Sequence, residues 1–269
     1  MSKSSNQIPR VNVMKEDFGW EIPVELVPIP SKGLIYNPES SLYKKESLKI
    51  KAMTAREEDI LSSAALIKEG TVLDHLIDSC VMEDLDMKDM IMGDRNALML
   101  AIRITGYGPD YPVRSTCDKC GTQNKFNVDL TSIAIKRLSI EPIEIGRNLF
   151  AYTLPVTKKK ILFKFPTLKD ERDRSIREKT LKSHIQSLVE SNVTGNLELA
   201  IQQIDDITDR NKIKHFIMNM PAYDSRSLRK FVRDSEPGMD MTCSFKCSNC
   251  NHENSAGIPV TSEFFWPST

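Results

Sequence analysis

Two Cys-x-x-Cys pairs, far apart in the chain, constrain its fold more than any other sequence feature. Both segments, residues 117–124 and 247–254, fit one pattern, C-x-x-C-[G/N]-x-[Q/E]-N. The position after the second cysteine must tolerate a positive φ, as Gly and Asn do, so that the turn's backbone N–H groups point at the thiolate sulfurs. The pattern therefore predicts two copies of one small metal-binding turn.

Together the two turns supply four thiolates, which is the ligand set of a tetrahedral structural zinc site with no open position. The predicted ligands are Cys117, Cys120, Cys247 and Cys250. Iron in a rubredoxin-like site has the same requirement. The two pairs of an ordinary zinc ribbon are separated by roughly 15–20 residues. Here more than a hundred residues separate them, so a whole segment is inserted between the halves of the ribbon.

Other interpretations of these cysteines stay open. His252 or Cys243 could replace one thiolate, and the two pairs could be unlinked, with one of them redox-active. A thioredoxin-like site requires a Cys-x-x-Cys that opens a helix after a strand. The polar residues 122–124 argue against such a helix.

The composition argues against several classes of protein. The 269 residues include 37 Lys and Arg against 37 Asp and Glu, so the formal net charge is zero. This balance disfavours a nucleic-acid binder, which normally relies on a positive field. No apolar run is long enough for a membrane span, and the N-terminus lacks the apolar region of a signal peptide. Six cysteines, four of them in Cys-x-x-Cys pairs, fit a reducing cytosol better than a disulfide scaffold.

Local patterns predict helices and short strands. Alternation over 47–53 predicts a strand, and the capping box at 54–57 predicts a helix over 55–68 that ends near Gly70. A further helix is expected over 196–205. Residues 95–105 are expected to be helical, although their alternation also allows a buried strand.

These patterns predict an α+β fold that is mainly helical, with a small two-knuckle zinc-ribbon β unit interrupted by a helical insertion and preceded by an extended arm. The expected segments are an N-terminal arm over 1–46, a helical region over 47–110, the first half of the ribbon with short strands over 111–158, a helical insertion over 159–238, and the second half of the ribbon with an aromatic tail over 239–269.

The two ends of the chain carry candidate partner-binding residues, because aromatic and apolar anchors concentrate binding energy at interfaces. They are Pro30, Leu34, Tyr36, Phe264, Phe265 and Trp266. The alternative is that each segment folds back onto the chain's own core. The acidic, methionine-rich stretch 82–94 lacks the spacing of a calcium loop, and is either a core segment or an interface.

No local pattern indicates catalysis. The chain has no phosphate-binding Gly-rich loop, no H-E-x-x-H, no G-x-S-x-G and no dinucleotide fingerprint. We therefore expect a protein that is not an enzyme.

Several short segments, in their order along the chain, resemble one known family. They are 30–36 (PSKGLIY), 53–61 (MTAREEDIL), 93–96 (GDRN), Ile102 and Arg103, Tyr107 and Gly108, 117–121 (CDKCG), 128–130 (VDL), and Phe264 and Phe265. This order is similar to that of the baseplate hub and hub-assembly proteins of contractile-tailed bacteriophages. The resemblance implies a non-enzymatic virion or assembly protein, made in the cytoplasm of the infected bacterium. Its expected partners are other tail baseplate and hub proteins.

Two alternatives come from other functional classes. The first is a zinc-ribbon nucleic-acid-binding accessory factor, which the zero net charge disfavours. The second is a thiol oxidoreductase that uses one Cys-x-x-Cys pair. Thiols bound to a metal would react only after chelation, whereas a redox pair would cycle freely with a reductant.

Overall fold

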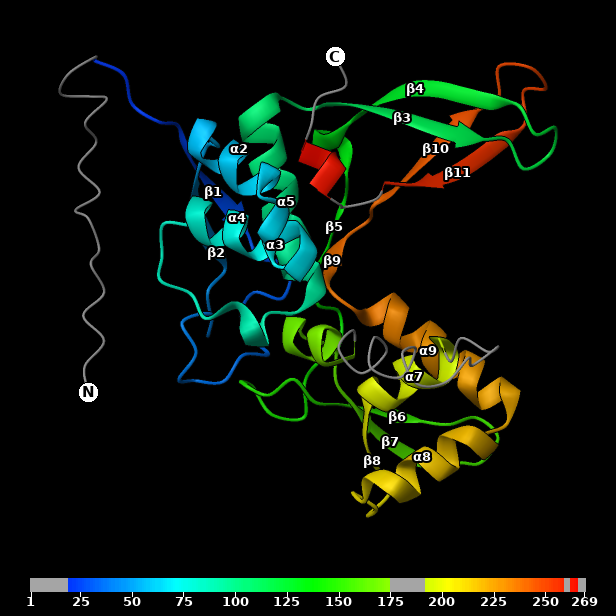
Figure 1. Ribbon diagram of the computed structural model, residues 1–269. Helices are drawn as coiled ribbons and strands as arrows, with labels where there is room; N and C mark the ends of the chain where they lie inside the picture. Colours follow the sequence, from blue (N-terminus) through cyan, green and yellow to red (C-terminus); the bar gives the residue numbers. More distant parts are fainter. Residues whose placement is uncertain (1–18, 175–191, 259–261, 266–269) are drawn as a thin grey trace.

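A long helix, α5 (Met92–Tyr107), is central to the N-terminal half of the fold, and segments from both ends of the chain pack against it (Figure 1). The computed structural model describes residues 19–174, 192–258 and 262–265. Eight residues of α5 are buried, and they lie on several sides of the helix. This burial explains why the sequence pattern of 95–105 also allowed a strand; the helical prediction is confirmed.

The N-terminal lobe places helices on a two-stranded antiparallel sheet. The strands are β1 (Val24–Pro28) and β2 (Ser47–Lys51), and the helical elements are α2 (Ala55–Ser62), α3 (Ala64–Glu69), α4 (Val72–Cys80) and η1 (Met87–Asp89). The predicted capping box opens α2, with Thr54 and Glu57 bonding each other's backbone. The helix expected over 55–68 is broken at Ser63, and its second part ends at Gly70, whose φ is +77°.

Two antiparallel hairpins extend together to one side of the molecule (Figure 1). The first consists of β3 (Asp110–Thr116) and β4 (Gln123–Asp129), followed by η2 (Leu130–Ser132); the second consists of β10 (Thr242–Lys246) and β11 (Glu253–Gly257). Phe126 of one hairpin stacks on Phe245 of the other, with ring centroids 4.7 Å apart. Between the hairpins and α9, β5 (Ile135–Lys136) pairs with β9 (Gly238–Met239) (Figure 1).

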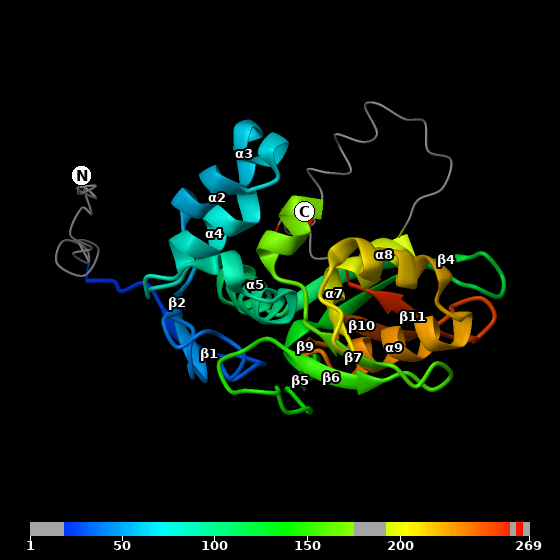
Figure 2. The ribbon, with the colours of Figure 1, turned by 90° about the horizontal axis from the view of Figure 1, so that it is seen from below.

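A second lobe lies between the two hairpins in sequence. It contains the antiparallel sheet β6-β7-β8, formed by β6 (Phe150–Thr153), β7 (Lys160–Phe163) and β8 (Ile201–Ile204), with helices α7 (Asn192–Ala200), α8 (Arg210–Asn219) and α9 (Ala222–Ser235) and a helical stretch at 168–174. Figure 2 shows α9 alongside β6 and β7, and Phe231 of α9 stacks on Tyr152 with ring centroids 4.5 Å apart.

The fold is therefore mixed α and β. The prediction that helices and short strands coexist is confirmed, whereas the prediction that helices dominate is not. The helix expected over 196–205 is wrong in its second half, because residues 201–204 form β8 and pair with β7. The segment 159–238, expected to be a helical insertion, contributes both β7 and β8 to the sheet.

Side chains and backbone of α5 hold distant segments in place. The carboxylate of Asp94 is buried and accepts hydrogen bonds from the backbone N–H of Ser31 at 2.9 Å and from the hydroxyls of Ser31 and Tyr36. Arg103, also buried, donates to the carbonyl oxygens of Phe264, Gly108 and Asp110. Consequently the turn at 29–36 and the short helix η3 (Ser262–Phe265) are both fastened to one helix.

A close backbone approach joins α5 to the strand that leads into the second hairpin. A Cβ atom on Gly93 would lie 1.8 Å from the carbonyl oxygen of Pro237, so only glycine fits there. Within the described ranges, no helix is both long and apolar enough to cross a membrane.

Candidate metal centre

The two Cys-x-x-Cys turns have the same backbone structure at equivalent positions. In the first, the backbone N–H of Cys117 donates to the carbonyl oxygen of Thr122 at 2.9 Å, and the backbone N–H of Gly121 donates to the carbonyl oxygen of Cys117 at 3.0 Å. In the second, the backbone N–H of Cys247 donates to the carbonyl oxygen of His252 at 2.9 Å, and the backbone N–H of Asn251 donates to the carbonyl oxygen of Cys247 at 3.0 Å. Gly121 and Asn251 have φ values of +70° and +55°, so the predicted need for a residue tolerant of positive φ holds in both turns.

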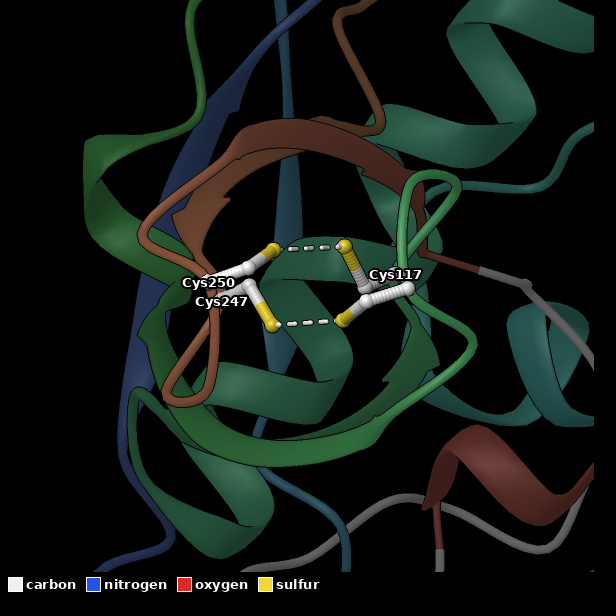
Figure 3. A group of neighbouring side chains, drawn as sticks. Cys117, Cys247 and Cys250 are labelled. Carbon is white, nitrogen blue, oxygen red and sulfur yellow. Dashed lines mark hydrogen bonds between the residues drawn. The ribbon is translucent and has the colours of Figure 1, made fainter.

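The structure brings the four cysteines into one cluster. Their sulfur atoms all lie within 4.8 Å of one another. The sulfurs of Cys117 and Cys250 are 3.7 Å apart, and those of Cys120 and Cys247 are 3.6 Å apart, so each close pair joins opposite hairpins (Figure 3). Four sulfurs at ~2.3 Å from a zinc ion form a tetrahedron with edges of about 3.8 Å. The donor set and its spacing therefore fit a four-thiolate metal ion.

Two asparagines, one from each hairpin, form hydrogen bonds to the cysteine turn of the opposite hairpin. Asn124 Oδ1 accepts from the backbone N–H of Ser248 at 2.9 Å, and Asn254 Oδ1 accepts from the backbone N–H of Asp118 at 3.0 Å. Each asparagine also donates through Nδ2 to a carbonyl oxygen of its own turn. Both are buried. The sulfurs are thus held together by protein hydrogen bonds as well as by any metal ion.

The thiols do not ionise independently. Hydrogen bonding with Thr122 lowers the pKa of Cys120 to about 6. The hydrogen bond from the backbone of His252 favours the thiolate of Cys250, but burial and the neighbouring thiols outweigh it and raise the pKa of Cys250 to about 12. A divalent cation would supply the charge that permits all four thiolates at once.

The alternative ligands lie outside this cluster. His252 contributes its backbone carbonyl to the second turn, and its side chain is exposed. The thiol of Cys243 donates to the carbonyl oxygen of Ala256 in the adjacent strand at 3.4 Å. Among the residues that the structure describes, the one group of three or more potential metal ligands is the four predicted cysteines.

The candidate partner-binding residues lie mostly inside the chain's own fold. Pro30, Tyr36, Phe264 and Phe265 are buried, Leu34 is half-buried, and Trp266 lies outside the described residues. The alternative that these segments fold back onto their own core thus describes four of the six. A role in partner binding stays a prediction.

Sequence reasoning missed the residues that support the cluster and the two chain ends. The two tails share an asparagine at positions 124 and 254, and this repetition was the signal for the cross-hairpin bonds. Asp94 and Arg103 both lie in segments of the family resemblance, but that resemblance did not indicate that they bind Ser31, Tyr36 and Phe264.

The fold and the cysteine cluster define a mixed α/β protein with a candidate structural metal centre. A family model described as "T4 bacteriophage base plate protein" matches residues 35–266, and the chain therefore belongs to this family of phage baseplate proteins. Comparison with curated proteins and with solved structures gives no match. Family membership indicates a structural component of the virion tail, with other phage tail proteins as its partners.

Proposed function

We propose that this protein is a non-enzymatic component or assembly factor of the baseplate hub, stabilised by a structural metal ion on Cys117, Cys120, Cys247 and Cys250. Support for the metal comes from four sulfur atoms within 4.8 Å of one another, contributed by two hairpins. Support for the hub comes from the residues of the sequence resemblance, several of which contact one another around α5. Asp94 binds Ser31 and Tyr36, and Arg103 binds Phe264.

The metal's role in this proposal is to hold the architecture together. Four thiolates fill a tetrahedral coordination sphere and leave no position for a substrate. Cross-linking the two turns closes a loop of more than a hundred residues, and a disulfide that closes such a loop restricts the unfolded chain by about 4–5 kcal/mol. Zinc binding contributes an apparent ~10–16 kcal/mol in small peptides, and less in a chain whose other parts can fold alone.

Metal analysis of the purified full-length chain tests this site. We expect one zinc ion per chain in the wild type. The Cys117→Ser and Cys250→Ser variants should lose this ion, and they should become insoluble or sensitive to protease. The Cys243→Ser variant is the matched control, because its thiol lies outside the cluster, and it should keep the metal. One iron per chain, with the colour of an iron–thiolate site, would retain the structural role and change only the metal. Wild-type protein without metal, or Cys117→Ser and Cys250→Ser variants with unchanged metal content and melting temperature, would refute the site.

Co-purification from infected cells tests the hub role. A tagged chain should be recovered with hub and other baseplate proteins from the cytoplasm of the host before tails are complete. Recovery with a polymerase or with nucleic acid would overturn the hub assignment in favour of an accessory factor. Recovery with peripheral baseplate proteins alone would place the protein away from the hub.

A further inference from the structure

The outer face of α9 carries a row of four exposed cations. Arg226, Arg229 and Arg233 follow one another at intervals of three and four residues, and Lys230 is next to Arg229. All four are exposed and share one face of the helix. Among the described residues, the first three form no ion pair or hydrogen bond through their side chains, and Arg233 reaches only its neighbour Asp234. On the opposite face, Leu228 is buried and Phe231 stacks on Tyr152 of β6. We call these four residues the basic face.

A hollow elsewhere on the molecule carries the opposite charge. Two loops, 37–41 and 84–89, surround an open depression of about 570 Å³. All the charged residues that line it are acidic. They are Glu39, Asp84, Asp86 and Asp89, and all four are exposed. The nearby Lys88 lies 3.8 Å from Asp86, and both side chains are mostly exposed, so this ion pair is weak. We call this depression the acidic hollow.

The two charged surfaces do not neutralise each other within one chain. In both views, α9 and the loops around the acidic hollow lie on different sides of the molecule (Figure 1, Figure 2). The zero net charge of the chain therefore includes two separated regions of opposite sign. One is convex, a helix with long side chains, and the other is concave. Surfaces that complement each other in charge and shape favour association and set its orientation.

We propose that the basic face of α9 docks into the acidic hollow of a second copy of this chain. The contact is head-to-tail, because each copy would use one surface for the copy before it and the other for the copy after it. Such contacts form closed rings or open filaments, according to the rotation between copies. The proposal is independent of the metal centre and of the hub role.

Sedimentation velocity of the full-length chain at about 50 mM and about 0.5 M salt tests the proposal, because exposed charges are screened at high salt. Self-association should weaken at least about tenfold at high salt and in two charge-reversal variants, Arg226→Glu/Arg229→Glu and Asp84→Lys/Asp89→Lys. The matched control is Lys68→Glu/Lys125→Glu, which makes the same charge change at exposed residues outside the basic face. It should associate as the wild type does.

Mixing the two charge-reversal variants gives the decisive measurement. The variant reversed on α9 keeps its acidic hollow, and the variant reversed in the hollow keeps its basic face. One intact surface of each kind is therefore present in the mixture, and the two reversed surfaces are also opposite in charge. The mixture should therefore form assemblies that contain both variants, whereas each variant alone should associate at least about tenfold more weakly than the wild type.

Two results would overturn the proposal. The first is a wild-type chain that stays monomeric at both salt concentrations. The second is salt-sensitive binding of a duplex DNA that is lost in Arg226→Glu/Arg229→Glu without any self-association of the wild type. In that case the basic face would belong to nucleic acid.

Discussion

Asn124 and Ser248 are joined across the two hairpins by a hydrogen bond of 2.9 Å, although more than a hundred residues separate them in the chain. Asn254 and Asp118 form the equivalent bond at 3.0 Å. The two bonds are related by the same approximate repeat that relates the cysteines. The arrangement of sulfurs therefore rests on a symmetrical pair of protein contacts.

The first prediction concerns these asparagines. Replacement of Asn124 or Asn254 by Ala leaves a backbone N–H of the opposite turn without its partner, so each variant should lose about 1–2 kcal/mol of the free energy of unfolding. Each should also release its metal at a lower chelator concentration. Denaturant titration and competition with a chelator measure the two effects. Asn127→Ala, an exposed residue of the same strand, is the control and should change neither. Equal behaviour of all three variants would contradict a positioning role.

A second prediction concerns the approach of α5 to the second hairpin. Gly93→Ala would place Cβ 1.8 Å from the carbonyl oxygen of Pro237, which is backbone and cannot rotate away. The variant should lose at least about 2 kcal/mol of the free energy of unfolding. Gly195→Ala is the matched control, because its Cβ meets no atom within 4 Å and its helix should gain about 0.5–1 kcal/mol. Thermal melts of both variants should thus shift in opposite directions.

The third prediction concerns the C-terminal segment. Arg103→Met removes the donors to the carbonyl oxygens of Phe264, Gly108 and Asp110, and should cost about 3 kcal/mol or more. Because the bond to Phe264 fastens η3, the C-terminal residues should become the first site of cleavage in limited proteolysis. Arg56→Met, at an exposed position on α2, should leave the cleavage pattern unchanged. Cleavage that begins elsewhere would show that Arg103 does not hold this segment.

The fourth prediction is a pH dependence. Burial raises the pKa of Asp94 to about 6, in spite of the hydrogen bonds from Ser31 and Tyr36 that favour its carboxylate. The unfolded value is about 3.9, so the folded state binds the proton more tightly. The contribution of this group to stability is therefore full below about pH 4, and about 3 kcal/mol is lost as the pH rises to about 7.

The Asp94→Asn variant isolates this effect because it cannot ionise. The free energy of unfolding of the wild type minus that of the variant, measured by denaturant titration, should decrease between about pH 4 and about pH 7. Other titrating groups contribute equally to both proteins and cancel. A difference that stays flat over this range would mean that Asp94 keeps an ordinary pKa in the folded protein.

The parts of the fold that local chemistry decides were predictable from the sequence. The capping box at Thr54, the left-handed residue at Gly70 and the turn residues Gly121 and Asn251 all occur where the sequence indicated them. The close approach of the four sulfurs was also predictable, because two matching turns with four thiolates favour one shared site.

What the sequence could not reveal depends on contacts between distant residues. Residues 201–204 continue a helical pattern, yet Ile204 pairs with Ile161 in the sheet, and this long-range pairing overrides the local preference. Likewise, no pattern around Gly93 or Asp94 indicates which segment packs against them. Pro237 and Ser31 come from opposite ends of the chain.

The split of the paired hairpins sets an order of events during synthesis. The first cysteine turn leaves the ribosome about ten seconds before the second, at the usual rates of elongation. Until then its thiols have no counterpart, and they are open to oxidation or to a wrong ion. A nascent chain that stalls before Cys247 therefore carries only one half of the cluster, and the four sulfurs can come together only after Cys247 and Cys250 have been made.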